Sequence, residues 1–341
     1  MHIKVQQIFN KDAATHPFHI GFNAPACYLQ HLTRSIIMST SRRTFIKNSA
    51  LTLAGVALLS KNAFSSAVPT GELMGIQLYS VRDDMTKNPL PTLKAIAEMG
   101  YKNVEHANYV ERKFYGYSAS EFRKVLDDLG LKMPSGHTVM GKGHWDESKK
   151  DFSDSWKYTV EDAATVGQQI VISPWLDESL RKTYDDLKRY MEVFNKCGEL
   201  CKKSGMKFGY HNHDFEFSVK LNDKPVYDIM LENTDKDLVA QQLDIGNLYN
   251  GGAKALDIVK RFPGRFQSMH VKDEIAAPSG GHEKFESTVL GKGIVPVKEV
   301  IDLGRSSGGT KHFIVEQESY QGKTPLESAK LDFDQMKKWG Y

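Results

Sequence analysis

Short apolar runs alternate with amphipathic segments from Gly75 to the end of the chain. The runs are rich in β-branched and aromatic residues, which is typical of buried parallel strands. They predict eight strands, at residues 75–81, 102–106, 132–137, 169–173, 207–211, 239–244, 266–270 and 312–316. The segments between them repeat apolar residues with helical spacing and predict helices at 89–99, 118–129, 151–166, 181–203, 225–232, 253–260, 295–305 and 325–338.

Glycines end several predicted helices, at positions 100, 130, 167 and 205. A helix commonly ends at a glycine because that residue adopts positive φ without strain. Eight strand–helix units in a chain of this length favour an α/β fold of the (β/α)8 TIM-barrel type. An open doubly wound sheet is the alternative, but no glycine-rich dinucleotide fingerprint follows the first strand. We therefore predict a single TIM-barrel catalytic domain over residues 68–341.

One long segment, residues 273–296, follows neither pattern and contains Pro278-Ser279-Gly280-Gly281 and Gly291-Lys292-Gly293. Irregular segments of this length in a compact domain are usually functional or disordered. Because the segment follows the seventh predicted strand, we expect it to lie over the barrel mouth. Both a lid and a loose surface insertion are consistent with the sequence.

The N-terminal part, residues 1–67, does not resemble part of a fold. Residues 41–47, Ser-Arg-Arg-Thr-Phe-Ile-Lys, are typical of a twin-arginine export signal, and the apolar stretch that follows leads to Ser65-Ser66-Ala67, which suits a signal-peptidase cut. The apolar stretch is too short to span a membrane, which takes about 20 residues. We expect export to the periplasm by the twin-arginine route and no stable membrane anchor.

A second methionine, Met38, lies close to the twin arginines. The residues before it show neither apolar periodicity nor a helix-cap pattern. We therefore interpret residues 1–37 as an over-extended start and residues 38–67 as the twin-arginine signal peptide.

The net charge of +3 comes from this N-terminal part. Residues 1–67 contain seven Lys or Arg and one Asp, so 38 of the 45 basic and 41 of the 42 acidic residues lie in the predicted domain. Proteins that bind nucleic acid usually carry a basic face. The slightly acidic domain therefore gives no indication of a nucleic-acid partner.

The two cysteines of the predicted domain, Cys197 and Cys201, lie on the apolar stripe of a predicted helix. We expect both to be small core residues. A disulfide is the weaker alternative, because two helical positions one turn apart are poorly aimed at each other.

Histidines and acids close several predicted strands. The C-terminal strand ends of a TIM barrel converge on one mouth. Asp244, His270 and Glu316 end three consecutive strands, and His211 ends the strand before them. Carboxylates and imidazoles together suit a divalent ion such as Mn²⁺, Co²⁺, Mg²⁺ or Zn²⁺. A single acid at a strand end is commonly only a helix cap, but three such residues at consecutive strand ends are hard to explain in that way.

Other polar residues near the predicted mouth are candidates for substrate contact. Glu105 ends the second strand, where a carboxylate is costly unless it is partnered. His213 shares a face with His211 if the strand continues, although a loop histidine bonded to backbone is an equal alternative. Trp175 follows the fourth strand and would either stack on a sugar or plug the barrel. We assign substrate binding to Glu105, His213, Trp175 and Asn247.

Several motifs occur in a characteristic order. They are Ile76-Gln77-Leu78-Tyr79-Ser80-Val81-Arg82, the strand that ends at Glu105, Tyr210-His211-Asn212-His213, Leu243-Asp244-Ile245-Gly246-Asn247, His270-Val271-Lys272-Asp273 and Leu290-Gly291-Lys292-Gly293. Together they resemble the sugar phosphate isomerase/epimerase family of xylose isomerase-like TIM barrels, over about residues 71–338. The resemblance implies one divalent metal bound by the last four strands, here through His211, Asp244, His270 and Glu316.

The first metal position departs from the commoner family pattern, Glu-Asn-His, because this chain has His211-Asn212-His213. In the family's ketose 3-epimerases, the first and last metal-bound glutamates are thought to exchange protons with opposite faces of the substrate carbon. A metal-bound imidazole has already donated its lone pair and is a poor base. The resemblance thus implies Glu316 as the base. His137, Lys272, Glu216 or a metal-bound water would be the acid.

The chemistry that the resemblance implies is removal of a proton α to a carbonyl, followed by isomerisation, epimerisation or loss of a β-leaving group. Few phosphorylated sugars occur outside the inner membrane, and no glycine-rich phosphate loop stands out. We therefore expect an enzyme acting on an unphosphorylated sugar or keto-glycoside, including β-elimination as a 3-keto-glycoside lyase.

Three alternatives differ from this expectation. A ketose or aldose isomerase or 3-epimerase on a free sugar would use the same site. A non-catalytic sugar-binding protein would be expected to lose the metal residues first. A nuclease of the endonuclease IV type would need a basic DNA-binding surface. The sequence leaves the substrate, the metal and a homo-oligomeric state open.

Overall fold

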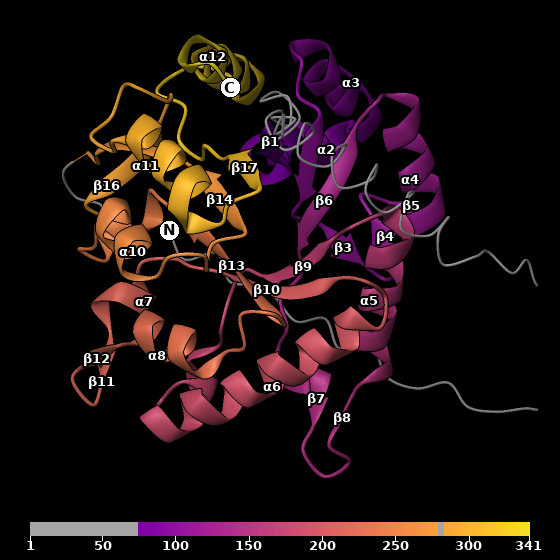
Figure 1. The fold of residues 1–341 in the computed structure, drawn as a ribbon. Helices are drawn as coiled ribbons and strands as arrows, with labels where there is room; N and C mark the ends of the chain where they lie inside the picture. Colours follow the sequence, from indigo (N-terminus) through magenta and orange to yellow (C-terminus); the bar gives the residue numbers. More distant parts are fainter. Residues whose placement is uncertain (1–73, 279–282) are drawn as a thin grey trace, which may run out of the picture. The chain divides into compact units, whose positions relative to one another are not determined.

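Eight parallel strands close into a barrel in a computed structural model, which describes residues 74–278 and 283–341 (Figure 1). In spatial order the strands are β1 (Met74–Gln77), β17 (His312–Val315), β14 (Ser268–Val271), β13 (Val239–Asp244), β10 (Lys207–His211), β9 (Ile170–Ser173), β6 (Lys132–His137) and β2 (Asn103–His106). The first and last strands pair in parallel, with Met74 opposite Phe313, and this pairing closes the barrel. The TIM-barrel prediction is confirmed.

Helices connect the strands of the barrel. The longer ones are α3 (Pro89–Met99), α4 (Ala119–Asp128), α5 (Asp154–Val166), α6 (Tyr184–Lys202), α8 (Val226–Asn233), α10 (Ala255–Arg261), α11 (Val297–Leu303) and α12 (Pro325–Trp339). Short helices are α2 (Arg82–Lys87), α7 (Phe215–Ser218) and α9 (Asn247–Asn250). Each predicted helix has a counterpart within a few residues, and Gly100 ends α3 with φ of 111°.

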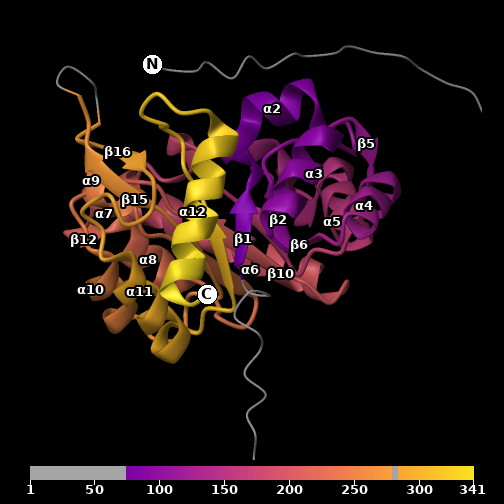
Figure 2. The same cartoon turned by 90° about the horizontal axis from the view of Figure 1, so that it is seen from above.

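The first strand is shorter than predicted. It ends at Gln77, and a 3-10 turn (Leu78–Val81) leads into α2. The Gln77 side chain accepts a hydrogen bond from the Tyr79 backbone N–H, which caps this turn and stops the strand. In Figure 2, α12 crosses beside β1, and α12 packs against both this turn and α3.

Small antiparallel sheets of two or three strands accompany the barrel. Their strands are β3 (Tyr109–Val110), β4 (Lys113–Phe114) and β5 (Tyr117–Ser118) in one sheet, and the pairs β7 (Trp145–Asp146) with β8 (Asp151–Phe152), β11 (Lys220–Leu221) with β12 (Lys224–Pro225), and β15 (Asp273–Ala276) with β16 (Phe285–Thr288). The segment 273–296, which the sequence predicts to be irregular, therefore contains a β-hairpin. Its tip, residues 279–282, lies outside the described residues.

Asp273 fixes the base of this hairpin. Its fully buried carboxylate accepts hydrogen bonds from the backbone N–H groups of Glu274, Gly291, Gly293 and Val295, at 2.8–3.0 Å. One side chain thus holds both ends of the segment, so the alternative of a loose insertion is wrong for its described parts.

Side chains alternate between the inside and the outside of the barrel wall. On β13, Leu243 joins the outer hydrophobic core, and so do Met269 on β14 and Val315 on β17. Gln242, the residue before Leu243, bonds instead to Ser268 of the neighbouring strand β14. Along each strand, the apolar residues therefore pack against the helices, and the polar residues between them face the barrel interior, where the site lies.

Cys197 and Cys201 lie in α6 as free, buried thiols, which confirms their expected place in the core. Among the described residues, no helix is long and apolar enough to cross a membrane. The predicted signal peptide and the interpretation of residues 1–37 concern a part of the chain outside the described residues.

Candidate metal centre

Four side chains from consecutive strands meet at the C-terminal end of the barrel. They are His211 (β10), Asp244 (β13), His270 (β14) and Glu316, which directly follows β17. One potential ligand atom from each lies within 4.8 Å of the others, and all four residues are buried. The structure thus brings together the four residues that the sequence assigns to a metal.

Only one carboxylate oxygen of Asp244 forms hydrogen bonds with the backbone. Its Oδ1 accepts the backbone N–H groups of Gly246 at 2.8 Å and Asn247 at 2.7 Å, which fixes the side chain. Its Oδ2 is buried and has no hydrogen-bond partner. A buried, unpartnered carboxylate oxygen is costly, and such oxygens commonly face a ligand.

Gln242, two residues before Asp244 on β13, orients two histidines through hydrogen bonds. Its Nε2 donates to Glu105 and Ser268, so its Oε1 is left to accept from His211 Nδ1 at 3.0 Å and from His137 Nε2 at 2.7 Å. With Nδ1 protonated, His211 keeps its Nε2 lone pair for a metal.

Glu105 orients the ring of His270 in a similar way. Glu105 Oε1 lies 2.6 Å from His270 Nε2, while His270 Nδ1 faces Glu316 Oε2 at 3.1 Å and Asp244 Oδ2 at 3.9 Å. A carboxylate behind a ligating histidine fixes the tautomer and the ring orientation. Here it leaves Nδ1 directed at the other candidate ligands.

Lys272, two residues after His270, supplies the nearest ammonium group. Its Nζ lies 2.5 Å from Glu318 Oε1, 2.9 Å from Asn247 Oδ1 and 3.2 Å from Glu316 Oε2. Although burial disfavours its charge, the nearby carboxylates, led by Asp244, raise the pKa of Lys272 well above its usual value. Lys272 is therefore a protonated group beside the metal candidates.

The pKa values of the two carboxylates are shifted in opposite directions. Burial raises the pKa of Asp244. Burial also opposes ionisation of Glu316, but Lys272 and His270 outweigh it and hold the pKa of Glu316 well below its usual value. For His270, burial is outweighed by Glu316 and Glu105, which raise its pKa to about 10. A metal would therefore replace a proton on His270.

The donor set fits a divalent ion. Two carboxylates and two imidazoles suit a borderline ion such as Zn²⁺, Mn²⁺ or Co²⁺, and the free Asp244 Oδ2 provides one oxygen directly. A second group, His137, His211 and His270, also lies within bonding range of one ion. The four-residue set is the better candidate because it shares His211 and His270 with this group and adds two carboxylates, whose negative charge offsets that of a divalent ion.

Three of the other predicted residues surround this centre. His137 is stacked against His270, with ring centroids 5.2 Å apart. Asn247 contacts both Asp244 and Lys272. His213 lies next to His211, with ring centroids 5.1 Å apart, and its buried Nδ1 has no hydrogen-bond partner. The predicted role of each remains untested.

Trp175 lies farther out. Its side chain is 42% exposed, and its ring packs edge-on against His213 at 5.4 Å and Phe215 at 5.2 Å. It therefore lies beside the site, without plugging the barrel.

Two predicted residues are held by hydrogen bonds to other residues of the protein. Glu105 is fully buried and bonds to Gln77 and Ser135 as well as to Gln242. Glu216 is also fully buried, and its two oxygens accept from the Tyr210 hydroxyl and the His213 backbone N–H. Burial of this kind argues against direct substrate contact by Glu105 and against proton transfer to substrate by Glu216.

Sequence reasoning missed several residues of the site. Gln242, Ser268 and Ser135 lie two positions before the strand-end residues Asp244, His270 and His137. They share a face with those residues. That alternation could have revealed them. Glu318, which pairs with Lys272, gave no such signal because it follows the last strand in an irregular segment.

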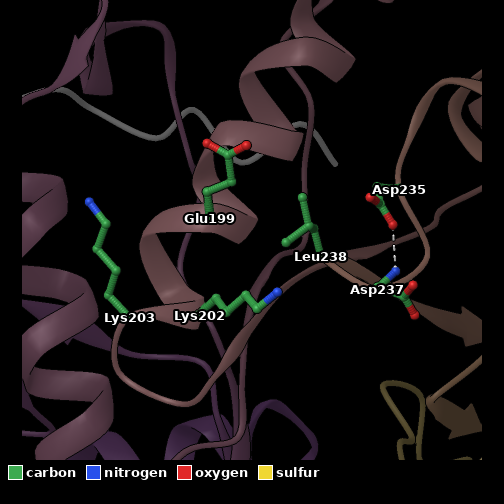
Figure 3. A pocket seen from close by; sticks show the side chains of 6 residues that line it. All are labelled: Glu199, Lys202, Lys203, Asp235, Asp237 and Leu238. Atoms are coloured by element: carbon green, nitrogen blue, oxygen red, sulfur yellow. Dashed lines mark hydrogen bonds between the residues drawn. The ribbon is translucent and has the colours of Figure 1, made fainter.

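A separate surface hollow lies elsewhere. Figure 3 shows the residues that line it: Glu199 and Lys202 of α6, Lys203 directly after this helix, and Asp235, Asp237 and Leu238. These residues directly precede β10 and β13, so the hollow is at the opposite end of those strands from the metal candidates. Enzymes with this fold place their active sites at the C-terminal strand ends, which excludes the hollow as the catalytic centre.

Known proteins share this sequence pattern. An inosose dehydratase from Clostridium perfringens is 31% identical over 101 residues, which cover 30% of this chain and 33% of that protein. The chain thus spans about a third of that relative's length. An inosose dehydratase from Lacticaseibacillus casei is 26% identical over 289 residues, 75% of this chain and 94% of that protein.

Solved structures share the fold. The structure of a sugar phosphate isomerase/epimerase from Parabacteroides distasonis is 26% identical with a TM-score of 0.67, and the match covers 80% of this chain and 96% of that one. The sequence profile described as "Xylose isomerase-like TIM barrel" matches residues 93–339. The chain therefore belongs to the xylose isomerase-like TIM barrel family.

Proposed function

We propose that this protein is a divalent-metal-dependent enzyme that removes a proton α to the carbonyl of an unphosphorylated sugar, keto-glycoside or related polyol ketone. The observation that carries the proposal is Asp244 Oδ2, which has no hydrogen-bond partner, lies 3.6 Å from Lys272 Nζ and belongs to a buried set of two carboxylates and two imidazoles. A divalent ion bound there would polarise the substrate carbonyl and stabilise the negative charge that develops on its oxygen.

Glu316 is the proposed base. Its low pKa keeps it ionised at neutral pH, as a base must be. Lys272 donates its hydrogen bond to Oε2, which leaves Oε1 to accept the proton. Of the other candidates, Glu216 is occupied by Tyr210 and His213 and has no free oxygen to offer.

Lys272 is the proposed acid. It is protonated and lies 3.2 Å from Glu316, so a base and an acid flank the same space. In an elimination, the C–H bond breaks at Glu316 and its electron pair forms the C=C bond. The β C–O bond then breaks, and the leaving oxygen takes a proton from Lys272.

Elimination is favoured over epimerisation because the centre has one available carboxylate base. His211 stands where a second glutamate would be needed, and it is held as a proton donor to Gln242. The inosose dehydratases among the relatives are named for loss of water, which is itself a β-elimination. This similarity supports a lyase, whether water or an aglycone leaves.

Incubation of metal-stripped and metal-reloaded protein with inosose, 3-keto-glucosides and free ketoses in D₂O would test the proposal. We expect metal-dependent exchange of the proton α to the carbonyl together with formation of an unsaturated product or release of an aglycone. Product formation that is unaffected by Glu316→Gln, or by removal of the metal, would refute the mechanism.

A sugar isomerase or epimerase is the second candidate. It is favoured by the 26% identity to the Parabacteroides distasonis protein described as a sugar phosphate isomerase/epimerase. The same D₂O experiment separates the two, because an isomerase or epimerase incorporates solvent deuterium into a product with the same number of hydroxyl groups. A non-catalytic sugar-binding protein would give no exchange with any substrate.

A further inference from the structure

His270, Lys272 and Glu274 are alternate residues where the chain runs from the barrel strand β14 into the hairpin strand β15. His270 is the third of the four residues of β14, Lys272 links β14 to β15, and Glu274 is the second residue of β15. Alternate residues of an extended chain share a face. His270 and Lys272 both reach Glu316 Oε2, whereas Asp273 between them turns away to the backbone of Gly291 and Gly293. Glu274 is therefore the outermost member of a row that faces the metal candidates.

Glu274 is an unusual residue for this place. Its side chain is 2% exposed, and its Oε2 is buried without a hydrogen-bond partner. Native proteins rarely leave a buried carboxylate oxygen unpaired, so such a group calls for an explanation. Burial, reinforced by the like charges of Asp244 and Glu318, raises the pKa of Glu274 to about 8.

Gly246 ties Glu274 to the metal candidates. A Cβ on Gly246 would lie 2.7 Å from Glu274 Oε1 and 2.8 Å from Lys272 Cγ, so only glycine allows this approach. The backbone N–H of Gly246 donates to Asp244 Oδ1. Gly246 thus lies against Glu274 and hydrogen-bonds to Asp244, whose Oδ2 also has no hydrogen-bond partner.

We propose that Glu274 binds substrate, its Oε2 forming a hydrogen bond with a hydroxyl group of a neutral polyol ketone held at the metal centre. This proposal rests on the proposed function. A hydroxyl fits a carboxyl group in either state, because it donates to the ionised form and accepts from the protonated form. A phosphate group would instead meet the carboxylates of Glu274, Glu318 and Asp244 with Lys272 as the nearest cation, so this side of the mouth disfavours phosphorylated substrates.

Substitution by a residue of similar shape separates binding from folding. Glu274→Met removes both oxygens but keeps the length of the side chain, whereas Glu274→Gln keeps a hydrogen-bonding group. Since the native carboxyl is buried beside other acids, neither change should lower the thermal unfolding temperature. Glu286→Met on the paired strand β16 is the matched control, because Glu286 pairs with Ile275, so its side chain lies on the opposite face of the hairpin from Glu274, where it bonds to Gln321.

The experiment is calorimetric titration of the metal-loaded proteins with myo-inositol, a polyol that needs no turnover, and KM measurement for each ketone that reacts. We expect Glu274→Met to raise Kd and KM by about tenfold or more, Glu274→Gln to recover part of this, and Glu286→Met to leave both unchanged. Unchanged Kd and KM in Glu274→Met, or tighter binding of myo-inositol phosphate than of myo-inositol, would overturn the proposal.

The two proposals fail in different ways. If no ketone reacts but myo-inositol binding depends on Glu274, the proposed reaction is wrong and the binding role of Glu274 stands. If ketones react with the same KM in wild type and Glu274→Met, the reaction stands and the role of Glu274 is wrong. If the wild-type protein neither binds myo-inositol nor turns over a ketone, both are refuted.

Discussion

At the scale of single residues, Asp244 separates its structural contacts from its ligand function. One oxygen is held by two backbone N–H groups, and the other has no hydrogen-bond partner and lies 3.6 Å from Lys272 Nζ. An Asn side chain could keep the first set of contacts and lose the charged ligand. This separation makes Asp244 the sharpest test of the metal centre.

We predict that Asp244→Asn folds normally but loses its metal. Its Oδ1 still accepts from Gly246 and Asn247, while a neutral amide nitrogen replaces the ligand oxygen. Elemental analysis after dialysis should find metal in the wild type and almost none in the variant. Equal metal content in both would show that the ion, if any, binds elsewhere.

A second prediction concerns Glu105, which contacts His270 without belonging to the ligand set. Glu105→Gln should weaken metal binding by about 10- to 100-fold, because partners behind ligating histidines contribute that much in other proteins. Competition with a chromophoric chelator measures the effect. Glu98→Gln is the control, since the Glu98 side chain is 68% exposed and far from the barrel interior. An unchanged affinity in Glu105→Gln would mean that Glu105 does not orient His270.

The residues at strand ends could be predicted from the sequence, because parallel strands bring their C-terminal ends together. The residues two positions earlier on the same strands, which form the next layer of the barrel interior, were not predicted. Gln242 looks like an ordinary polar residue in VAQQLD, and its role depends on distances to Glu105 and His137 that only the closed barrel creates. Glu274 was missed because the segment that contains it was expected to be irregular, although its spacing from His270 and Lys272 follows strand alternation.

At the scale of elements, α12 carries a buried acid that is remote from the metal centre. Asp332 is 1% exposed; its Oδ1 accepts the Leu290 backbone N–H, and its Oδ2 has no partner. Burial raises its pKa from 3.8 to about 7. Between these two values the folded chain holds the proton and the unfolded chain releases it, so stability falls as pH rises.

Asp332→Asn should remove this pH dependence. An amide keeps the contact to Leu290 and cannot ionise, so the stability of the variant relative to the wild type should be higher at pH 8 than at pH 5, by roughly 1.4 kcal/mol for each pH unit between pH 5 and the folded-state pKa of about 7. Chemical denaturation at both pH values measures the difference. A constant difference between the two proteins would show that Asp332 does not titrate in this range.

The β15–β16 hairpin depends on Asp273, whose carboxylate accepts four backbone N–H groups from both ends of the segment. Asp273→Ala would leave these groups without an acceptor. We predict faster proteolysis within residues 273–296 than in the wild type, at a temperature where the barrel strands stay protected from hydrogen exchange. Unchanged cleavage would mean that the hairpin is held by other contacts.

Element boundaries were predicted well where a cap marks them. The helix at 89–99 begins at a proline and ends at Gly100, and both limits agree with the structure. The first strand was predicted too long, because the stop at Gln77 comes from a side-chain bond to the Tyr79 backbone that apolar periodicity does not report. The hairpin in residues 273–296 was missed for a similar reason, since Asp273 organises it through contacts distant in sequence.

At the scale of the whole molecule, a bound ion should stabilise the barrel. The candidate ligands come from four separate strands, so the unfolded chain cannot present them together. Adding Mn²⁺, Co²⁺ or Zn²⁺ to stripped protein should raise the free energy of unfolding by about 2.7 kcal/mol at a hundredfold excess over Kd. Differential scanning calorimetry checks this, with Asp244→Asn as the control that should not respond.

The metal centre can form only when the barrel closes. Glu316 directly follows β17, the last strand to be synthesised, and β17 is positioned by its pairing with β1, the first. Contacts between such distant parts of a chain form late in folding. While the chain is still on the ribosome, three of the candidate ligands can already have emerged without the fourth. Metal acquisition would then follow release of the finished chain, so a cell would have to supply the ion to a folded protein rather than to a growing one.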